Sequence, residues 1–153
     1  MNVKPIINAA LTGTSAMTLF SYLISEKQEE NFKEPFVLAD LISRIRPSKL
    51  KSDAAVEGWG LHFLVGFMFA SGYHKLWNSG KVKPGLISGS LLGAASGLVG
   101  IMVWKAVFKF HPNPPTKSLK KYFGHLLLSH VVFGAFAGLG YKPKAEVIQP
   151  DIY

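Results

Sequence analysis

The stretch HFLVGFMFASGY, residues 62–73, has a counterpart further along the chain in HVVFGAFAGLGY, residues 130–141. Over an offset of 68 residues, the two stretches share a histidine, a glycine, a small residue, a second glycine and a tyrosine. The matched pairs are His62 and His130, Gly66 and Gly134, Ala70 and Gly138, Gly72 and Gly140, and Tyr73 and Tyr141. Five matches of such special residue types in twelve positions indicate an internal repeat.

Each repeated stretch gathers these residues on one helical face. Residues four, eight and eleven positions after a given residue lie on the same side of an α-helix. The face that begins at His62 therefore continues through Gly66, Ala70 and Tyr73, and the face that begins at His130 is built in the same way. An imidazole exposed to lipid would lack hydrogen-bond partners, at a cost of several kcal/mol. We therefore expect both faces to point inward, with the two histidines at one depth.

The composition favours a membrane protein. Of 153 residues, 48% are hydrophobic and only 17% are charged. Four long tracts contain no Asp, Glu, Lys or Arg, and they are residues 8–25, 58–74, 84–104 and 122–141. A helix needs about 20 residues to cross a hydrocarbon core of roughly 30 Å. With their flanking residues, the tracts predict a single transmembrane domain over residues 1–153, with spans at 5–25, 58–77, 84–108 and 119–141.

The predicted fold is all-α, a four-span transmembrane helical bundle built from two repeated helical hairpins. The connection at residues 78–83 is short, so the second and third spans should be antiparallel neighbours. The long loop at residues 26–57 contains PFVLADLISRI, whose apolar residues form one helical stripe. The stripe consists of Val37, Leu38, Leu41, Ile42 and Ile45. It predicts an amphipathic helix that lies on the membrane surface or the bundle, or docks on a partner.

The charge pattern predicts an orientation. The net charge is +8, and the basic residues lie between the apolar tracts, which favours lipid headgroups over nucleic acid as partners. Six of the 17 Lys and Arg residues fall on the side of both termini, and eleven fall on the other side. The positive-inside rule therefore predicts both termini outside and the more basic connecting loops in the cytoplasm. The absence of cysteine excludes disulfides, thiolate nucleophiles and cysteine-bound metals.

Glycines four residues apart mark a second pattern. They are Gly85, Gly89, Gly93 and Gly97 in the third span, with Gly13 as a weaker counterpart in the first. Such ladders let helix backbones approach closely, so we expect helix-packing surfaces. No carboxylate lies inside a predicted span, which leaves the usual acid–base catalysis without its groups. The preferred interpretation is a non-enzymatic accessory or assembly subunit that packs through these faces in a larger membrane complex or homo-oligomer.

The paired histidines leave other interpretations open. Each imidazole can bond a neighbouring carbonyl or hydroxyl and fix the helix register. Alternatively, His62 and His130 hold the iron of a b-type haem, while Gly66 and Gly134 clear room for the porphyrin. A third interpretation is a protonation switch or a quinone pocket. His125 lies about 140° around the helix from His130, so the two cannot share a ligand, and neither His125 nor His111 receives a role.

A family resemblance rests on the same residues. The string AALTGTSAMTLF, residues 9–20, and the His-x3-Gly-x3-small pattern at His62 and His130 resemble the YagU-like group of small bacterial inner-membrane proteins. The resemblance covers the helical spans and leaves out the loop at residues 26–57. It implies a multi-pass helical bundle in a bacterial inner membrane, and it transfers no catalytic residues.

Overall fold

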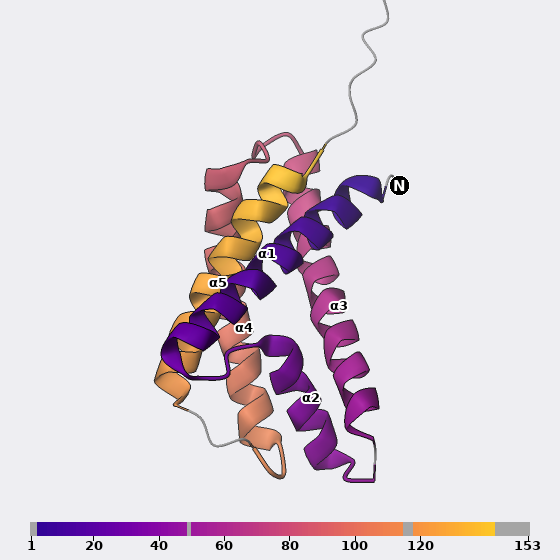
Figure 1. Cartoon of the computed structure of the whole chain (residues 1–153). Helices are drawn as coiled ribbons and strands as arrows, with labels where there is room; N and C mark the ends of the chain where they lie inside the picture. Colours follow the sequence, from indigo (N-terminus) through magenta and orange to yellow (C-terminus); the bar gives the residue numbers. More distant parts are fainter. Residues whose placement is uncertain (1–2, 49, 115–117, 143–153) are drawn as a thin grey trace, which may run out of the picture.

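The computed structural model describes residues 3–48, 50–114 and 118–142, and this part of the chain contains five α-helices and no strand (Figure 1). The helices are α1 (Lys4–Gln28), α2 (Glu34–Ile45), α3 (Lys51–Asn78), α4 (Leu86–Phe110) and α5 (Leu119–Gly140). All except α2 are long and apolar enough to cross a membrane. The predicted all-α class is confirmed, and the four long helices are compatible with a multi-pass membrane protein.

The starts of two helices differ by two residues or more from the starts of the predicted spans. The third helix begins at Lys51, well before the predicted Gly58, because its polar first turns are held by packing and Ala54 within them is fully buried. The fourth begins at Leu86 instead of Pro84, since Gly85 has an extended backbone with φ 161° and ψ 179°. Hydrophobicity locates the membrane-crossing part of a helix, but it does not show how far the helix continues beyond that part.

The long helices alternate in direction, and both ends of the described chain lie at the top of Figure 1. The closest helix pairs are α4 with α5, α1 with α5, α2 with α3 and α1 with α3. Although α3 and α4 are consecutive and antiparallel, they do not pack closely along their length. They meet at the top of Figure 1 and diverge downward, where α2 lies between them. The two helices are antiparallel as expected, but they are neighbours only near their connection.

Backbone-to-backbone contact joins α4 to α5. A Cβ added to Gly134 would overlap the carbonyl oxygen of Gly89, and a Cβ on Gly93 would overlap that of His130. Gly138 sits in the same way on the backbone of Gly85. A Cβ on Gly97 would lie 2.9 Å from Leu127 Cδ1, and one on Gly13 in α1 would lie 2.8 Å from the Phe133 carbonyl oxygen. The predicted packing surfaces are thus used inside the chain, where α5 already covers the ladder of α4.

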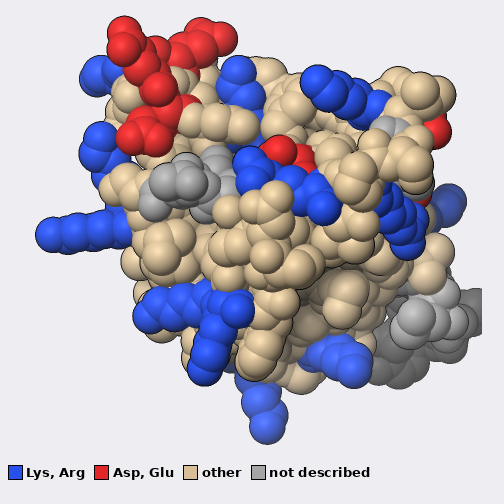
Figure 2. Space-filling model, turned by 90° about the horizontal axis from the view of Figure 1, so that it is seen from below, with Lys and Arg blue, Asp and Glu red and all other residues tan. Residues whose placement is uncertain are grey.

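The short helix α2 packs alongside α3. Its Val37 and Leu41 are buried, whereas Ile45 at the end of the predicted stripe is 57% exposed. Close approach depends on Gly58, where a Cβ would overlap the Pro35 carbonyl oxygen and lie 2.9 Å from the Ala39 nitrogen. The bundle therefore covers the buried side of α2. The end of the molecule near α2 is ringed by Lys and Arg side chains, with acidic side chains gathered at one corner (Figure 2).

Candidate functional site

His62 and His130 line the same cavity, between α3 and α4. Its volume is about 480 Å³, and its wall is mainly apolar. Among the lining residues, Val65 of α3 and Val103 of α4 are 43% and 54% exposed, so the mouth opens on the outer surface of the bundle.

The hydrogen bonds of His62 fix its tautomer. The ring is 6% exposed, and its Nε2 lies 2.9 Å from Thr18 Oγ1. The single hydroxyl hydrogen of Thr18 is donated to the Thr14 carbonyl oxygen at 2.7 Å. Thr18 must therefore accept the bond from His62 Nε2–H. In the neutral ring, the lone pair is then on Nδ1.

His130 adopts the opposite tautomer. This ring is also 6% exposed, and its Nδ1 lies 2.8 Å from the Leu126 carbonyl oxygen. Because a carbonyl oxygen can only accept, His130 Nδ1 carries the hydrogen and Nε2 carries the lone pair. The ring packs edge-on to Phe69, with centroids 5.6 Å apart, and beside Gly100, where a Cβ would lie 3.3 Å from Nε2. The prediction that both histidine faces point inward is confirmed, since all members of both are buried.

Of the two glycines predicted to lie beside the histidines, one lines the cavity and the other does not. Gly66 lines the cavity, and a Cβ there would overlap Thr14 Oγ1. Gly134 is not among the lining residues and lies in the backbone contact between α4 and α5. The two glycines hold equivalent positions in the repeated stretches, but Gly66 faces α1 whereas Gly134 faces α4. The cavity therefore brings together His62, His130 and Gly66, whereas Gly134 lies outside its lining.

A carboxylate also lines this cavity, which the sequence analysis missed. Glu34 lies in the first turn of α2 and is 3% exposed. Its Oε1 is 3.9 Å from His125 Nε2. Glu34 lies outside the predicted spans, which contain no carboxylate. It reaches the cavity because α2 folds back against the bundle. Only its position just before the apolar stripe of α2 suggested that it would follow this helix inward.

His125, which had no predicted role, belongs to a buried polar cluster. Its Nε2 lies 2.9 Å from Ser129 Oγ and 3.0 Å from Ser21 Oγ. The imidazole stacks between two phenyl rings, with centroid distances of 5.5 Å to Phe20 and 4.6 Å to Phe32. The cluster joins α1, α5 and the segment that leads into α2, so it positions the end of the cavity where Glu34 lies.

The other histidines and the repeated tyrosines tie helices together. His111 Nε2 lies 3.1 Å from the Leu41 carbonyl oxygen and so connects the end of α4 to α2. Tyr73 and Ser96 join α3 to α4 near the top of the bundle, with 2.6 Å between their hydroxyl oxygens. A hydrogen bond between Tyr141 Oη and His74 Nδ1, which lie 2.7 Å apart, joins the end of α5 to α3.

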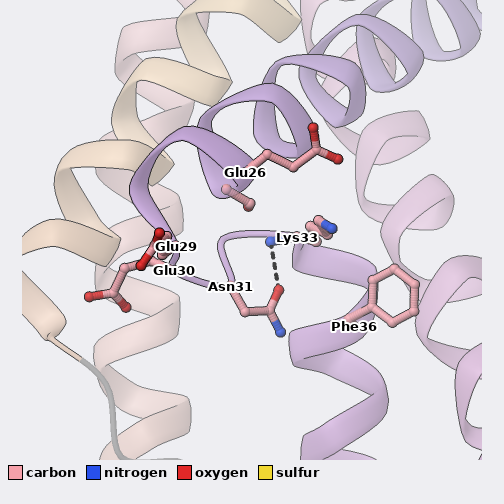
Figure 3. A pocket seen from close by; sticks show the side chains of 7 residues that line it. Glu26, Glu29, Glu30, Asn31, Lys33 and Phe36 are labelled. Carbon is pink, nitrogen blue, oxygen red and sulfur yellow. Dashed lines mark hydrogen bonds between the residues drawn. The ribbon is translucent and has the colours of Figure 1, made fainter.

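A second pocket, of about 380 Å³, lies where α1 ends, and three of its lining residues are glutamates (Figure 3). The carboxylate of Glu26 points away from those of Glu29 and Glu30. Glu30 Oε1 pairs instead with Lys121 Nζ at 3.4 Å. Within the described ranges, no group of three or more His, Asp or Glu side chains is arranged to hold a metal ion. The pocket is therefore a weaker candidate for a site than the cavity.

Comparison with known proteins adds no assignment. No family model matches this chain, and neither a curated protein nor a solved structure matches it.

Proposed function

We propose that this protein is a membrane-embedded binding module that holds a lipophilic small molecule in the cavity lined by His62 and His130. One observation carries the proposal: two buried imidazoles share an apolar cavity whose mouth, at Val65 and Val103, lies on the exposed outer surface of the bundle. Binding sites for small molecules are typically apolar cavities with a few polar groups that orient the ligand. A lipophilic ligand dissolved in the bilayer would meet both features.

A relation between two repeated hairpins would explain the position of the cavity. If α1 with α3 and α4 with α5 are related hairpins, then the contact between α1 and α5 corresponds to one between α4 and α3. The first of these interfaces is packed, and the second is open. The amphipathic helix α2 has no counterpart in the second hairpin, and by docking on α3 it breaks the symmetry. The cavity then occupies the place of the missing interface.

A quinone-sized molecule suits the cavity better than a b-type haem. Haem ligation through His62 Nε2 would break its hydrogen bond with Thr18. Gly134, the second glycine expected to make room for the porphyrin, is already used between α4 and α5. A smaller lipophilic molecule requires neither change. An absorption spectrum separates the two, since a Soret band that disappears in His62→Ala and His130→Ala would establish haem.

Calorimetric titration with 4-nonylphenol tests binding in the cavity. The purified protein in dodecyl maltoside should bind it saturably, and Val103→Phe should weaken binding at least about tenfold by filling the mouth. Met102→Phe is the matched control, because Met102 is 62% exposed on the same helix and does not line the cavity. Absence of saturable binding, or equal binding by the two variants, would contradict the proposal.

We place the protein in a bacterial inner membrane, in keeping with its YagU-like resemblance, with the basic end of Figure 2 in the cytoplasm. The chain has no native cysteine, so single cysteines can report the orientation. Ser79→Cys, between α3 and α4, should react with an impermeant maleimide in spheroplasts. Ser52→Cys, at the start of α3, should react only after permeabilisation, and the reverse pattern would invert the orientation.

An accessory role in a larger complex or homo-oligomer is a second proposal with a narrower basis. The glycine ladder of α4 is covered by α5, so a partner would need another surface. The outer face of α4 is the best candidate, because Ile87 and Leu91 are 77% and 68% exposed. Stoichiometric co-purification that is lost in Leu91→Trp would support this role, and a monomer without partners would contradict it.

A further inference from the structure

We infer that the ligand of the cavity presents a hydrogen-bond donor, such as the hydroxyl group of a lipophilic phenol or quinol, to His62 and His130. This inference rests on the proposed function and specifies the chemistry of its ligand. It follows from which ring nitrogens are already engaged by the protein.

Both imidazoles offer lone pairs. His62 uses Nε2–H to bond Thr18, and His130 uses Nδ1–H to bond the Leu126 carbonyl oxygen. Within the described residues, no protein group bonds His62 Nδ1 or His130 Nε2. A neutral imidazole nitrogen without hydrogen can only accept. The two histidines at the cavity therefore present two acceptors and no donor to a ligand.

The remaining polar groups of the wall agree with this assignment. Glu34 brings carboxylate oxygens to the cavity, and these also accept when ionised. The indole of Trp104 carries the one N–H group among the other lining side chains of the described chain. That indole is packed against Phe108 and Tyr122, with ring centroids 5.1 and 5.6 Å away. A ligand with only carbonyl oxygens, such as an oxidised quinone, would leave the acceptor nitrogens of His62 and His130 unpaired.

The cavity should therefore bind a ligand with a hydrogen-bond donor more tightly than a similar ligand without one. A buried acceptor left without a partner loses the hydrogen bonds that it had in water, which strongly favours a ligand that restores one. A pair of compounds that differ in one hydrogen isolates this effect. The phenol 4-nonylphenol has an O–H group, and 4-nonylanisole replaces this hydrogen with a methyl group while keeping the ring and the alkyl chain.

Calorimetric titration of the whole protein in dodecyl maltoside tests the inference. We expect 4-nonylphenol to bind at least about tenfold more tightly than 4-nonylanisole, after correction for their partition into empty micelles. His130→Phe keeps an aromatic ring but removes the acceptor, so the ratio of the two dissociation constants should fall toward one. Loss of structural support alone would weaken both compounds and would leave the ratio unchanged.

The outcomes of the titrations distinguish the donor assignment of the ligand from the proposed binding function of the cavity. Equal affinities, or tighter binding of the ether, would overturn the donor assignment and leave the binding cavity in place. Failure of both compounds to bind saturably would overturn the proposed function itself. If His130→Phe does not fold, the ratio measured on the native protein still decides the inference, and His62→Phe gives a second variant.

Discussion

Replacing Gly134 with alanine tests the closest helix contact in the bundle. The new Cβ would lie 2.7 Å from both Cα and N of Gly93 and would overlap the Gly89 carbonyl oxygen. These are backbone atoms, which cannot rotate away as a flexible side chain can. To restore the 3.4 Å of ordinary contact with Gly93 alone, α4 and α5 must separate by at least about 0.7 Å. A gap of about 0.5–1 Å forfeits roughly a quarter to a half of the dispersion attraction between facing atoms.

The magnitude follows from two opposing effects. Overpacking of this kind costs about 1–3 kcal/mol, while alanine regains about 1 kcal/mol of helix propensity over glycine. We therefore expect Gly134→Ala to lower the free energy of unfolding by up to about 2 kcal/mol. Gly124→Ala is the matched control on the same helix, because nothing lies within 4 Å of its Cβ position. This variant should be as stable as the native protein or slightly more stable.

Unfolding in mixed micelles with increasing sodium dodecyl sulfate, followed by far-ultraviolet circular dichroism, measures the difference between the two variants. Gly124→Ala should unfold at a higher detergent fraction than Gly134→Ala. Equal midpoints would refute the reasoning, since they would mean that the backbones of α4 and α5 are not in contact at Gly134.

Three further substitutions test other contacts with the same unfolding assay. Thr18→Val should destabilise the protein by about 1–3 kcal/mol, because His62 Nε2–H loses its buried acceptor, and an unchanged midpoint would argue against the assigned tautomer. Tyr73→Phe should cost about 1 kcal/mol through loss of the hydrogen bond to Ser96 in α4, and an unchanged midpoint would show that this bond does not stabilise the bundle. Gly58→Ala should release α2 from α3 and speed amide hydrogen exchange in α2. Gly60→Ala should not, because the Cβ position of Gly60 is open. Equal exchange rates in the two variants would show that α2 does not depend on the contact at Gly58.

The sequence predicted the long helices because membrane crossing depends on a simple physical condition. A span must be apolar over about 20 residues, and the four tracts meet this condition wherever they pack. The glycine ladder likewise indicated close packing, since small residues matter only where backbones approach. It did not identify the partner helix. The same glycine spacing would be found if Gly93 lay on an outer face of the bundle. Only the fold shows that the backbone of His130 in α5 lies against it.

For the candidate site, the sequence located the histidines but not their surroundings. The cost of exposing imidazole to lipid predicted that His62 and His130 would face inward, as they do. Their hydrogen-bond partners are set by the rotation of each helix about its axis, which no spacing in the sequence determines. Glu34 was missed for a related reason, because α2 reaches the bundle through tertiary contacts at Gly58 and His111 that lie far from it in the chain.

The docking of α2 also accounts for the existence of an open cavity in a chain so rich in glycine. Glycine ladders tend to close helix interfaces, and between α4 and α5 they have done so. On α3 the equivalent small-residue face is divided: Gly58 receives α2, and Gly66 receives Thr14 of α1. Both of these glycines of α3 are therefore engaged by other helices, and the ladder of α4 is committed to α5. No helix backbone therefore fills the space between α3 and α4. The space is lined by side chains that are not buried in the other helix interfaces, including both imidazoles.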